Sequence, residues 1–306
     1  MKGGFTLTFE DLLKEIQSSV RSERKVAVAH ATDEGLFFAA KQALEYGIAS
    51  FIFVGPLELM KDLSKQTGVS AIERCEFIDS ETEQESAMIA AGLVGKGDAD
   101  VLMKGMVGTS TLLKAVLNKE SGLRTGNVLS HVAAFDLPAR TGLLFVTDAA
   151  MNIAPDLKEK IAITQNAVDV AKSIGIKTPK VAALAAVETV NPAMQATLDA
   201  AVLTQMNKRG QIAGCTIDGP LAFDIAVSPE AARQKKVHSD VAGYADILVV
   251  PAIETGNALY KSLTIFGNAE VGGIITGAKA PIVLTSRADS TESKLLSIAV
   301  AVGSAG

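Results

Sequence analysis

Short apolar segments alternate with longer amphipathic segments along most of this chain, and no other feature limits the fold as strongly. The apolar segments show little polar alternation, and they span residues 25–31, 49–54, 100–103, 180–187, 212–217, 246–250 and 281–285. Strands of this kind are buried on both faces, and helices between them favour parallel pairing. We therefore expect an α/β fold with mostly parallel sheets.

The segments between the strands predict helices. They cover residues 33–46, 56–65, 83–94, 109–118, 156–174, 192–208, 257–266 and 291–302. Asn191 followed by Pro192 is a typical helix start, and Ser228 followed by Pro229 predicts another. Residues 131–135 and 142–147 flank a turn-like segment, so we expect an antiparallel pair there. This pair interrupts the alternation and predicts a domain boundary near residue 130.

Composition limits the class of protein. The chain has 306 residues, of which 48% are hydrophobic, and this length favours two domains over one. Its net charge of −5, without a basic stripe, argues against a nucleic-acid partner. No apolar run approaches the roughly 18 residues that a membrane span needs. No signal peptide is apparent, and Cys75 and Cys215 lie far apart, so we expect a cytoplasmic protein without disulfides.

Polar and basic residues gather where predicted strands meet predicted helices. These junctions contain Lys104, Gly105, Thr109 and Ser110; residues 217–224; Thr255, Gly256, Asn257, Tyr260 and Lys261; and Ser286 with Arg287. In a parallel α/β fold such junctions share one edge of the sheet, where ligands bind. Helix capping alone could explain Thr109, Ser110 and Asn257, but it does not require Lys104 or Arg287.

The last junction has the composition of an anion site. Ser286 and Arg287 supply a hydroxyl and a guanidinium beside the start of a helix, which favours phosphate. Asp289 and Glu292 follow at a spacing of three. They fit a helix cap, with Asp289 as the cap and Glu292 reaching back, and one of them could instead act as a general base.

Common catalytic motifs are missing from the sequence. We find no P-loop, no early G-x-G-x-x-G, no H-E-x-x-H and no G-x-S-x-G. The three histidines, His30, His131 and His238, are dispersed, and each is expected to be structural. His131 is kept as a further candidate because it lies near the expected domain boundary.

Several motifs together resemble those of the phosphate acetyl/butyryltransferase family. They cover residues 219–224, 241–251, 255–257, 260–261, 267–270 and 286–287. In the N-terminal half, residues 102–105 and 122–131 resemble the butyryl branch more than the acetyl branch. The resemblance runs in order along almost the whole chain.

This resemblance implies a fold and a reaction. The fold would have two α/β/α domains around a cleft, like the isocitrate/isopropylmalate dehydrogenases. The first domain would contain residues 1–128 and 281–306, and the second residues 129–280. The reaction would transfer a short acyl group, butyryl or branched, reversibly between coenzyme A and phosphate. It implies acyl-CoA, phosphate and acyl phosphate as substrates and products, no further cofactor, no catalytic metal, and at least a homodimer.

Roles for individual residues also come from the resemblance. It assigns Ser286 to the CoA thiol and Arg287 to the phosphoryl group. The acetyl branch has an aspartate where this chain has Ser293, so the general base stays open, with Glu292 first and Asp289 second. Lys104 or Lys261 would assist Arg287 on the departing phosphate, and Thr255, Gly256 and Asn257 would donate hydrogen bonds to it.

Three alternatives remain at this point. A phosphate acetyltransferase would use the same mechanism, and acyl-chain length is a weak inference because one methylene is worth only about 1–3 kcal/mol. A metal-dependent decarboxylating dehydrogenase would need an aspartate cluster, for which Asp218, Asp224 and Asp246 are candidates. A non-enzymatic CoA- or phosphate-binding protein would need only the anion site.

Overall fold

The computed structural model describes residues 7–18, 24–69, 74–285 and 289–306, and they form two compact units. Unit 1 comprises Val128–Ala269 together with the first eight residues, and unit 2 comprises Phe9–Asn127 and Glu270–Gly306. A compact unit is a group of residues that pack together, whereas a domain folds on its own. The predicted domains, with boundaries at residues 128 and 281, therefore stay a prediction.

The sheet of unit 2 is parallel except at one strand. Its strands are ordered β3-β2-β1-β4-β11-β10. They are β1 (Lys25–Ala29), β2 (Ser50–Gly55), β3 (Cys75–Asp79), β4 (Val101–Lys104), β10 (Glu270–Thr276) and β11 (Ile282–Val283). β10 runs antiparallel to β11, with Ile274 opposite Val283, while β11 runs parallel to β4. The amino end of β10 therefore lies at the carboxyl end of β11.

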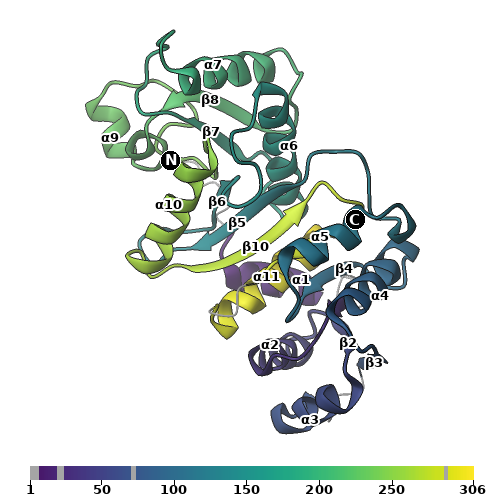
Figure 1. Ribbon diagram of the computed structural model, residues 1–306. Coiled ribbons are helices and arrows are strands. Elements are labelled where there is room, and N and C mark those ends of the chain that lie inside the picture. The colour runs from purple at the N-terminus through teal and green to yellow at the C-terminus, as the bar shows by residue number, and fades with distance from the viewer. Residues whose placement is uncertain (1–6, 19–23, 70–73, 286–288) are drawn as a thin grey trace. The chain divides into compact units, whose positions relative to one another are not determined.

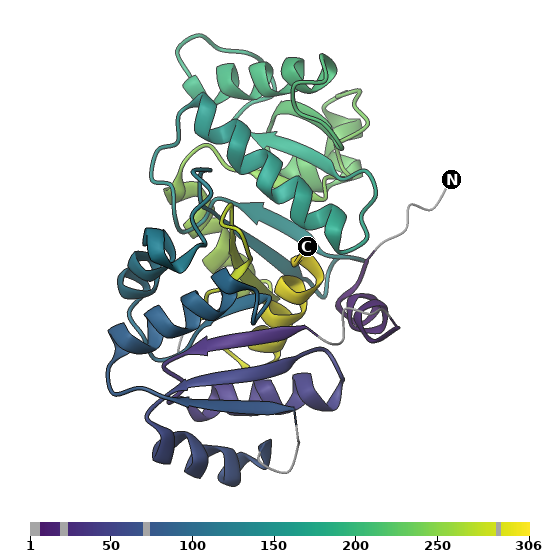
Figure 2. The ribbon, with the colours of Figure 1, turned by 90° about the vertical axis from the view of Figure 1, so that its right-hand side faces the viewer.

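Helices cover both faces of this sheet (Figures 1 and 2). They are α1 (Phe9–Ser18), α2 (Glu34–Glu45), α3 (Leu57–Thr67), α4 (Glu83–Lys96), α5 (Thr109–Leu117), the short 3₁₀ helix η3 (Lys119–Ser121) and α11 (Thr291–Ser304). α11 packs against β10, α2 and α1, and α4 packs against α5 and η3. β1 is buried from Val26 to Ala29, as expected for a strand between two helical layers.

Unit 1 repeats this design with different strands. Its order is β5-β6-β9-β7-β8. The strands are β5 (Ser130–Asp136), β6 (Leu144–Thr147), β7 (Lys180–Leu184), β8 (Thr216–Leu221) and β9 (Ile247–Val249). β5 and β6 form the expected antiparallel pair, with Ala133 opposite Val146. β6, β9, β7 and β8 are parallel, so their carboxyl ends share one edge.

The helices of unit 1 also flank its sheet. They are α6 (Leu157–Ser173), α7 (Gln195–Lys208), α8 (Phe223–Val227), α9 (Pro229–Gln234) and α10 (Ile253–Ile265). α6 begins with a complete capping box between Asp156 and Glu159. Among the described residues, no helix is long and apolar enough to cross a membrane. Together the two units confirm the predicted α/β fold with mostly parallel sheets.

Several expected element boundaries were wrong. α7 begins at Gln195 rather than at Pro192, because residues 191–194 form a turn in which Met194 N–H donates to the carbonyl of Asn191. α10 begins at Ile253, four residues before the expected start at Asn257. The sequence analysis missed α1, β3 and β10 altogether.

Candidate active site

Lys104 lies at the carboxyl end of β4, beside Thr285, which directly precedes Ser286 and Arg287 in the sequence. Its ammonium donates to the carbonyl oxygen of Gly105 at 3.3 Å and to that of Thr285 at 3.4 Å. The chain therefore places a cation next to the end of β11, as the junction hypothesis requires. Ser286 and Arg287 lie outside the described residues.

Gly105 follows Lys104 and is required by packing. Its N–H donates to the carbonyl of Ala29, and a Cβ added to it would lie 2.5 Å from the carbonyl oxygen of His30. The end of β4 thus presses on the end of β1 so closely that a larger residue would collide with backbone.

Thr109 and Ser110 are exposed and begin α5. Neither is the cap, because the N-cap is Gly108, whose N–H donates to the carboxylate of Glu83 at 3.1 Å. The capping explanation for these two hydroxyl residues is therefore wrong, and both side chains face solvent.

The first turn of α11 differs from the predicted cap. Its N-cap is Ser290, whose hydroxyl accepts from the N–H of Ser293 at 3.0 Å, so Asp289 and Glu292 do not form the capping box. The carbonyl of Asp289 instead accepts from the buried ammonium of Lys294 at 2.6 Å. A serine is an equally good cap, and here it lies one residue further along.

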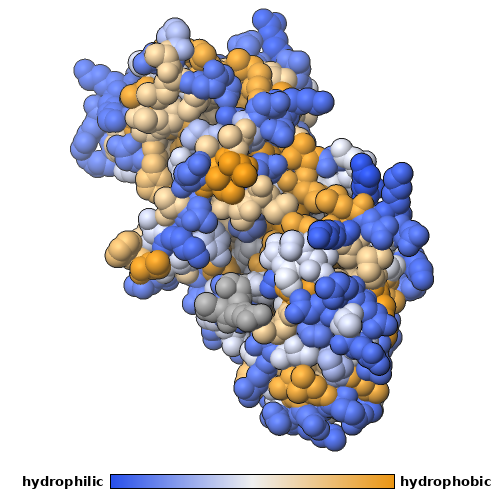
Figure 3. Space-filling model, viewed as in Figure 1, coloured by the Kyte–Doolittle hydropathy of each residue, from blue (hydrophilic) through white to orange (hydrophobic). Residues whose placement is uncertain are grey.

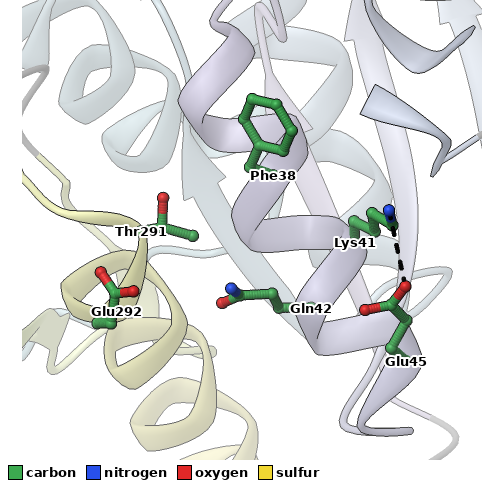
Figure 4. Close-up of a pocket in the computed structure, with 6 residues that line it drawn as sticks. All are labelled: Phe38, Lys41, Gln42, Glu45, Thr291 and Glu292. Carbon is green, nitrogen blue, oxygen red and sulfur yellow. Dashed lines mark ion pairs between the residues drawn. The ribbon is translucent and has the colours of Figure 1, made fainter. Parts of the chain in front are cut away.

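Glu292 faces a pocket of about 350 Å³ between α11 and α2. Figure 4 shows Glu292 and Thr291 opposite Gln42 of α2, with Phe38 one turn away and Lys41 paired to Glu45 at 3.8 Å. Glu292 itself is exposed.

Thr255, Gly256 and Asn257 lie within α10 rather than in a loop before it. The N–H of Gly256 donates to the carbonyl of Ala252, so it belongs to the helix. A Cβ on Gly256 would lie 2.6 Å from the carbonyl oxygen of Asp148, which explains the glycine by close packing. Thr255 and Asn257 are exposed, and their side chains can act as donors.

Tyr260, Lys261 and His131 come together on the same side of unit 1. The ring of Tyr260 contacts Phe135 edge-on at 5.3 Å between centroids and lies 6.1 Å from the ring of His131. The ammonium of Lys261 lies 5.4 Å from the centroid of Tyr260. The contacts thus bring a cation and two aromatic groups together.

His131 is a buried member of the predicted site residues in unit 1. Burial lowers the pKa of its imidazole, and the charge of nearby Asp148 opposes this shift. Its Nδ1 has no hydrogen-bond partner, while the carboxylate of Asp148 accepts from the backbone N–H of His131 and from several other N–H groups. His131 is therefore neutral at pH 7.

The aspartates proposed for a metal site do not converge. Asp224 follows β8 and Asp246 precedes β9, so they lie at opposite edges of a parallel sheet. The carboxylate of Asp218 accepts from the N–H of Gly219 within a strand. Within the described ranges, no three His, Cys, Asp or Glu side chains could share a metal ion.

Both cysteines are poor nucleophiles. Burial raises the pKa of the Cys75 thiol to about 11, and burial does the same for Cys215. A thiol of this pKa is almost entirely protonated at neutral pH. A covalent cysteine intermediate is therefore disfavoured.

A cavity in unit 1 was not predicted from the sequence. It has a volume of about 570 Å³ near the amino ends of α6 and α7. An ion pair of 2.6 Å between Lys160 and Asp199 closes one side, with both side chains nearly buried. The other lining residues are Ala154, Pro155, Asp156, Leu157, Gln195, Ala196, Leu198, Val202 and Pro251. No local motif marks this cavity, because its walls come from separate helices.

Similarity to known proteins runs along nearly the whole chain. A family model described as phosphate acetyl/butaryl transferase matches residues 78–302. A probable phosphate butyryltransferase of Bacillus subtilis (strain 168) is 56% identical and covers 94% of this chain and 95% of the relative. A phosphate butyryltransferase of Clostridium acetobutylicum is 48% identical over 98% of both chains. The chain therefore belongs to the phosphate acetyl/butaryl transferase family, which confirms the resemblance found in the sequence.

Solved structures agree with this assignment. A branched-chain phosphotransacylase from Enterococcus faecalis V583 has a TM-score of 0.83 and 39% identity, and covers 92% of this chain and 99% of that chain. A 4-hydroxythreonine-4-phosphate dehydrogenase from Klebsiella pneumoniae has a TM-score of 0.56 at 12% identity, which is a likeness of fold alone. The expected likeness to a dehydrogenase fold is therefore confirmed.

Proposed function

We propose that this chain is an acyltransferase that moves a butyryl or branched short acyl group reversibly between coenzyme A and phosphate. The observation that carries this proposal is the near full-length similarity to a probable phosphate butyryltransferase, at 56% identity. The branched-chain phosphotransacylase, at 39% identity over 92% of the chain, supports it independently. Acyl-CoA and phosphate are the substrates that the family implies.

In the proposed step, the CoA thiol gives its proton to a base and its sulfur attacks the acyl carbon of the acyl phosphate. The C–S bond forms as the C–O bond to phosphate breaks, and phosphate leaves with that electron pair. A free thiol with a pKa near about 8.5 is mostly protonated at neutral pH, so a base accelerates the attack. Glu292 is the first candidate for this base and Asp289 the second.

Cations would stabilise the departing phosphate. Arg287 takes this role, with Ser286 beside the thiol, and Lys104 or Lys261 assists. Thr255 and Asn257 would add side-chain donors, and Tyr260 with His131 would form the wall behind Lys261. Holding both substrates in line could supply several kcal/mol of the rate enhancement, by the general scale of orientation effects.

One assay separates the proposal from its alternatives. Butyryl-CoA is mixed with phosphate and EDTA, and free CoA is followed with a thiol reagent. Release that depends on phosphate is expected for the acyltransferase. Absence of release, together with NAD reduction on a hydroxyacid and magnesium, would identify a dehydrogenase instead. Absence of both reactions would leave a CoA- or phosphate-binding protein.

Substitution of the phosphate-binding arginine tests the assignment of roles. We expect Arg287→Ala to lose far more activity than Glu292→Ala, because a small fraction of a free thiol is already ionised at neutral pH without a base, whereas the phosphate charge needs a partner throughout the step. Near-wild-type turnover in Arg287→Ala would contradict the assignment.

A kinetic series from acetyl-CoA through propionyl-CoA to butyryl-CoA and branched acyl-CoA would then distinguish this chain from a phosphate acetyltransferase.

We also propose that the protein is a homodimer or larger homo-oligomer. Ile265 and Phe266, at the end of α10, are 65% and 85% exposed. Hydrophobic atoms protrude at this end of α10, at the left of the view in Figure 3. Exposed apolar groups of this size are typical of protein contacts. Light scattering should show a dimer or larger assembly, and Phe266→Asp should shift it toward the monomer.

A further inference from the structure

Glu270, the first residue of β10, is joined to the first turn of α11 by two hydrogen bonds. Its Oε2 accepts from the hydroxyl of Ser290 at 2.9 Å and from the hydroxyl of Ser293 at 2.8 Å. A carboxylate only accepts, so both hydroxyl protons point at Glu270. The start of the helix is thus tied to the start of the strand through one oxygen atom.

Each serine also accepts a backbone hydrogen bond, which fixes its orientation. The hydroxyl of Ser290 accepts from the N–H of Ser293 at 3.0 Å, and the hydroxyl of Ser293 accepts from the N–H of Val271 at 3.2 Å. Neither hydroxyl can turn without breaking two hydrogen bonds. The network formed by Glu270, Ser290 and Ser293, here called the Glu270 clamp, therefore has one arrangement.

Charge favours the same arrangement. The carboxylate of Glu270 lies at the amino end of a 14-residue helix, where the helix dipole stabilises an anion. No Lys or Arg side chain of the described residues forms an ion pair with Glu270. Among the described residues, the clamp is therefore held by hydroxyl groups and by the helix.

The clamp lies at the edge of the sheet that the proposed reaction uses. The N–H of Leu284 donates to the carbonyl of Gly273, so the start of β10 lies at the end of β11 where Thr285 follows. Thr285, which contacts Lys104, is the next residue along. The two candidate bases, Asp289 and Glu292, each directly precede a clamped serine.

We propose that Glu270 is a positioning residue for acyl transfer, acting through Ser290 and Ser293 to fix the first turn of α11 and the acidic groups that it carries. This inference rests on the proposed function. Glu270 itself touches no reacting atom in the proposed step. Its effect arises because displacement of a reacting group by about 1 Å can cost up to 100-fold in rate.

The test compares Glu270→Ala with Glu270→Gln. A glutamine oxygen can accept both hydroxyl protons, whereas alanine removes the acceptor. We expect Glu270→Ala to lower kcat for CoA and butyryl phosphate about tenfold, with KM for CoA changed less than threefold, on the scale of such positional effects. Glu270→Gln should keep kcat within about threefold of the wild type, since its side-chain oxygen still accepts from both serines and holds the first turn of α11 in place. Glu58→Ala, an exposed acid in the first turn of α3, is the matched control and should leave kcat unchanged.

Hydrogen exchange reports on the clamp without any catalysis. The amide protons of Val271 and Ser293 should exchange faster in Glu270→Ala and near the wild-type rate in Glu270→Gln. Thermal unfolding of each variant shows that it is folded. Faster exchange with an unchanged kcat would overturn the positioning role, and so would a glutamine variant as slow as the alanine variant. A wild-type protein without acyl transfer would overturn the proposed function, while exchange would still show whether the clamp exists.

Discussion

Two helices that carry candidate site residues, α10 and α11, are held in opposite ways. Residues 293–303 of α11 are all buried, and serines of that helix accept hydrogen bonds from the backbone of β10. In α10 the buried residue is Gly256, and the end of the helix is exposed. The geometry of α11 is therefore set by the core of unit 2. Substitutions in α10 can report on function with little effect on folding.

The largest expected effect on stability comes from truncating one leucine in each helix. Leu296 of α11 is fully buried, so Leu296→Ala should lower the free energy of unfolding by about 2–5 kcal/mol. Leu259 of α10 is partly exposed, and Leu259→Ala should cost less than about 1 kcal/mol. Denaturant unfolding of both variants measures the difference. Equal losses would show that α10 is as deeply packed in solution as α11.

Two glycines, Gly272 packed against α11 and Gly256 within α10, test the same difference between the helices. A Cβ on Gly272 would lie 2.8 Å from Leu296 Cγ, and one on Gly256 would lie 2.8 Å from Ala149 Cα. We expect Gly272→Ala to destabilise by about 1–3 kcal/mol because α11 has no room to move. Gly256→Ala should destabilise less, because α10 can shift outward.

The outward shift of α10 in Gly256→Ala should lower activity. In Gly256→Ala the displaced α10 carries Tyr260 and Lys261 with it, so kcat/KM should fall even though the protein stays folded. Steady-state kinetics measures the expected loss of kcat/KM, and thermal unfolding of the same samples shows that the variant stays folded. If Gly256→Ala loses stability and keeps activity, α10 contributes to folding rather than to catalysis, contrary to this prediction.

The third prediction concerns pH and the histidine behind α10. The pKa of His131 is lowered by burial, so protons bind the unfolded chain, with a histidine pKa of about 6.5, more readily than the folded protein. Its contribution to stability is complete above pH 6.5 and is lost as pH falls, by at most about 1.4 kcal/mol per unit.

Substitution isolates this contribution. His131→Gln should remove the part of the pH dependence below 6.5, as measured by urea unfolding at several pH values. His238→Gln changes an exposed histidine and serves as the control. Identical pH profiles for His131→Gln and the wild type would show that folding does not change the pKa of this imidazole.

The smallest effect on stability is expected at Lys261. Its side chain is exposed on α10, so Lys261→Ala should change the free energy of unfolding by less than about 0.5 kcal/mol. If Lys261 contacts the phosphate, KM for phosphate should rise several-fold as a charge-assisted hydrogen bond is lost. Phosphate titrations at fixed butyryl-CoA measure this, with Lys158→Ala as an exposed lysine control on α6 that should leave KM unchanged.

The sequence predicts most of the buried parallel strands because their burial on both faces gives unbroken apolar segments. It misplaces β8, which begins at Thr216 rather than at Ile212. It missed β10, where Gly272 and Gly273 interrupt that signal. Gly272 is present because Leu296 of α11 presses on it, which is a tertiary reason that no local pattern shows.

The same limit applies to the candidate site. Gly256 suggested a loop before α10, whereas it is a helical residue chosen for contact with the turn at Asp148. The junction of Lys104 with the end of β11 was predicted because parallel strands share an edge. The Glu270 clamp was not, since residues 270, 290 and 293 meet only after β10 and α11 have packed.

The chain order of the two units also determines when each can be completed during synthesis. All of the residues of unit 1 have left the ribosome once residue 269 has emerged, yet unit 2, which begins with Phe9, still lacks β10, β11 and α11. Until then β4 has no neighbour on the side that β11 will occupy, and α2 lacks the helix that covers it. Unit 2, whose larger segment precedes that of unit 1 in the chain, is therefore completed last, and its open strand edge makes it the part of the nascent chain that most needs a chaperone.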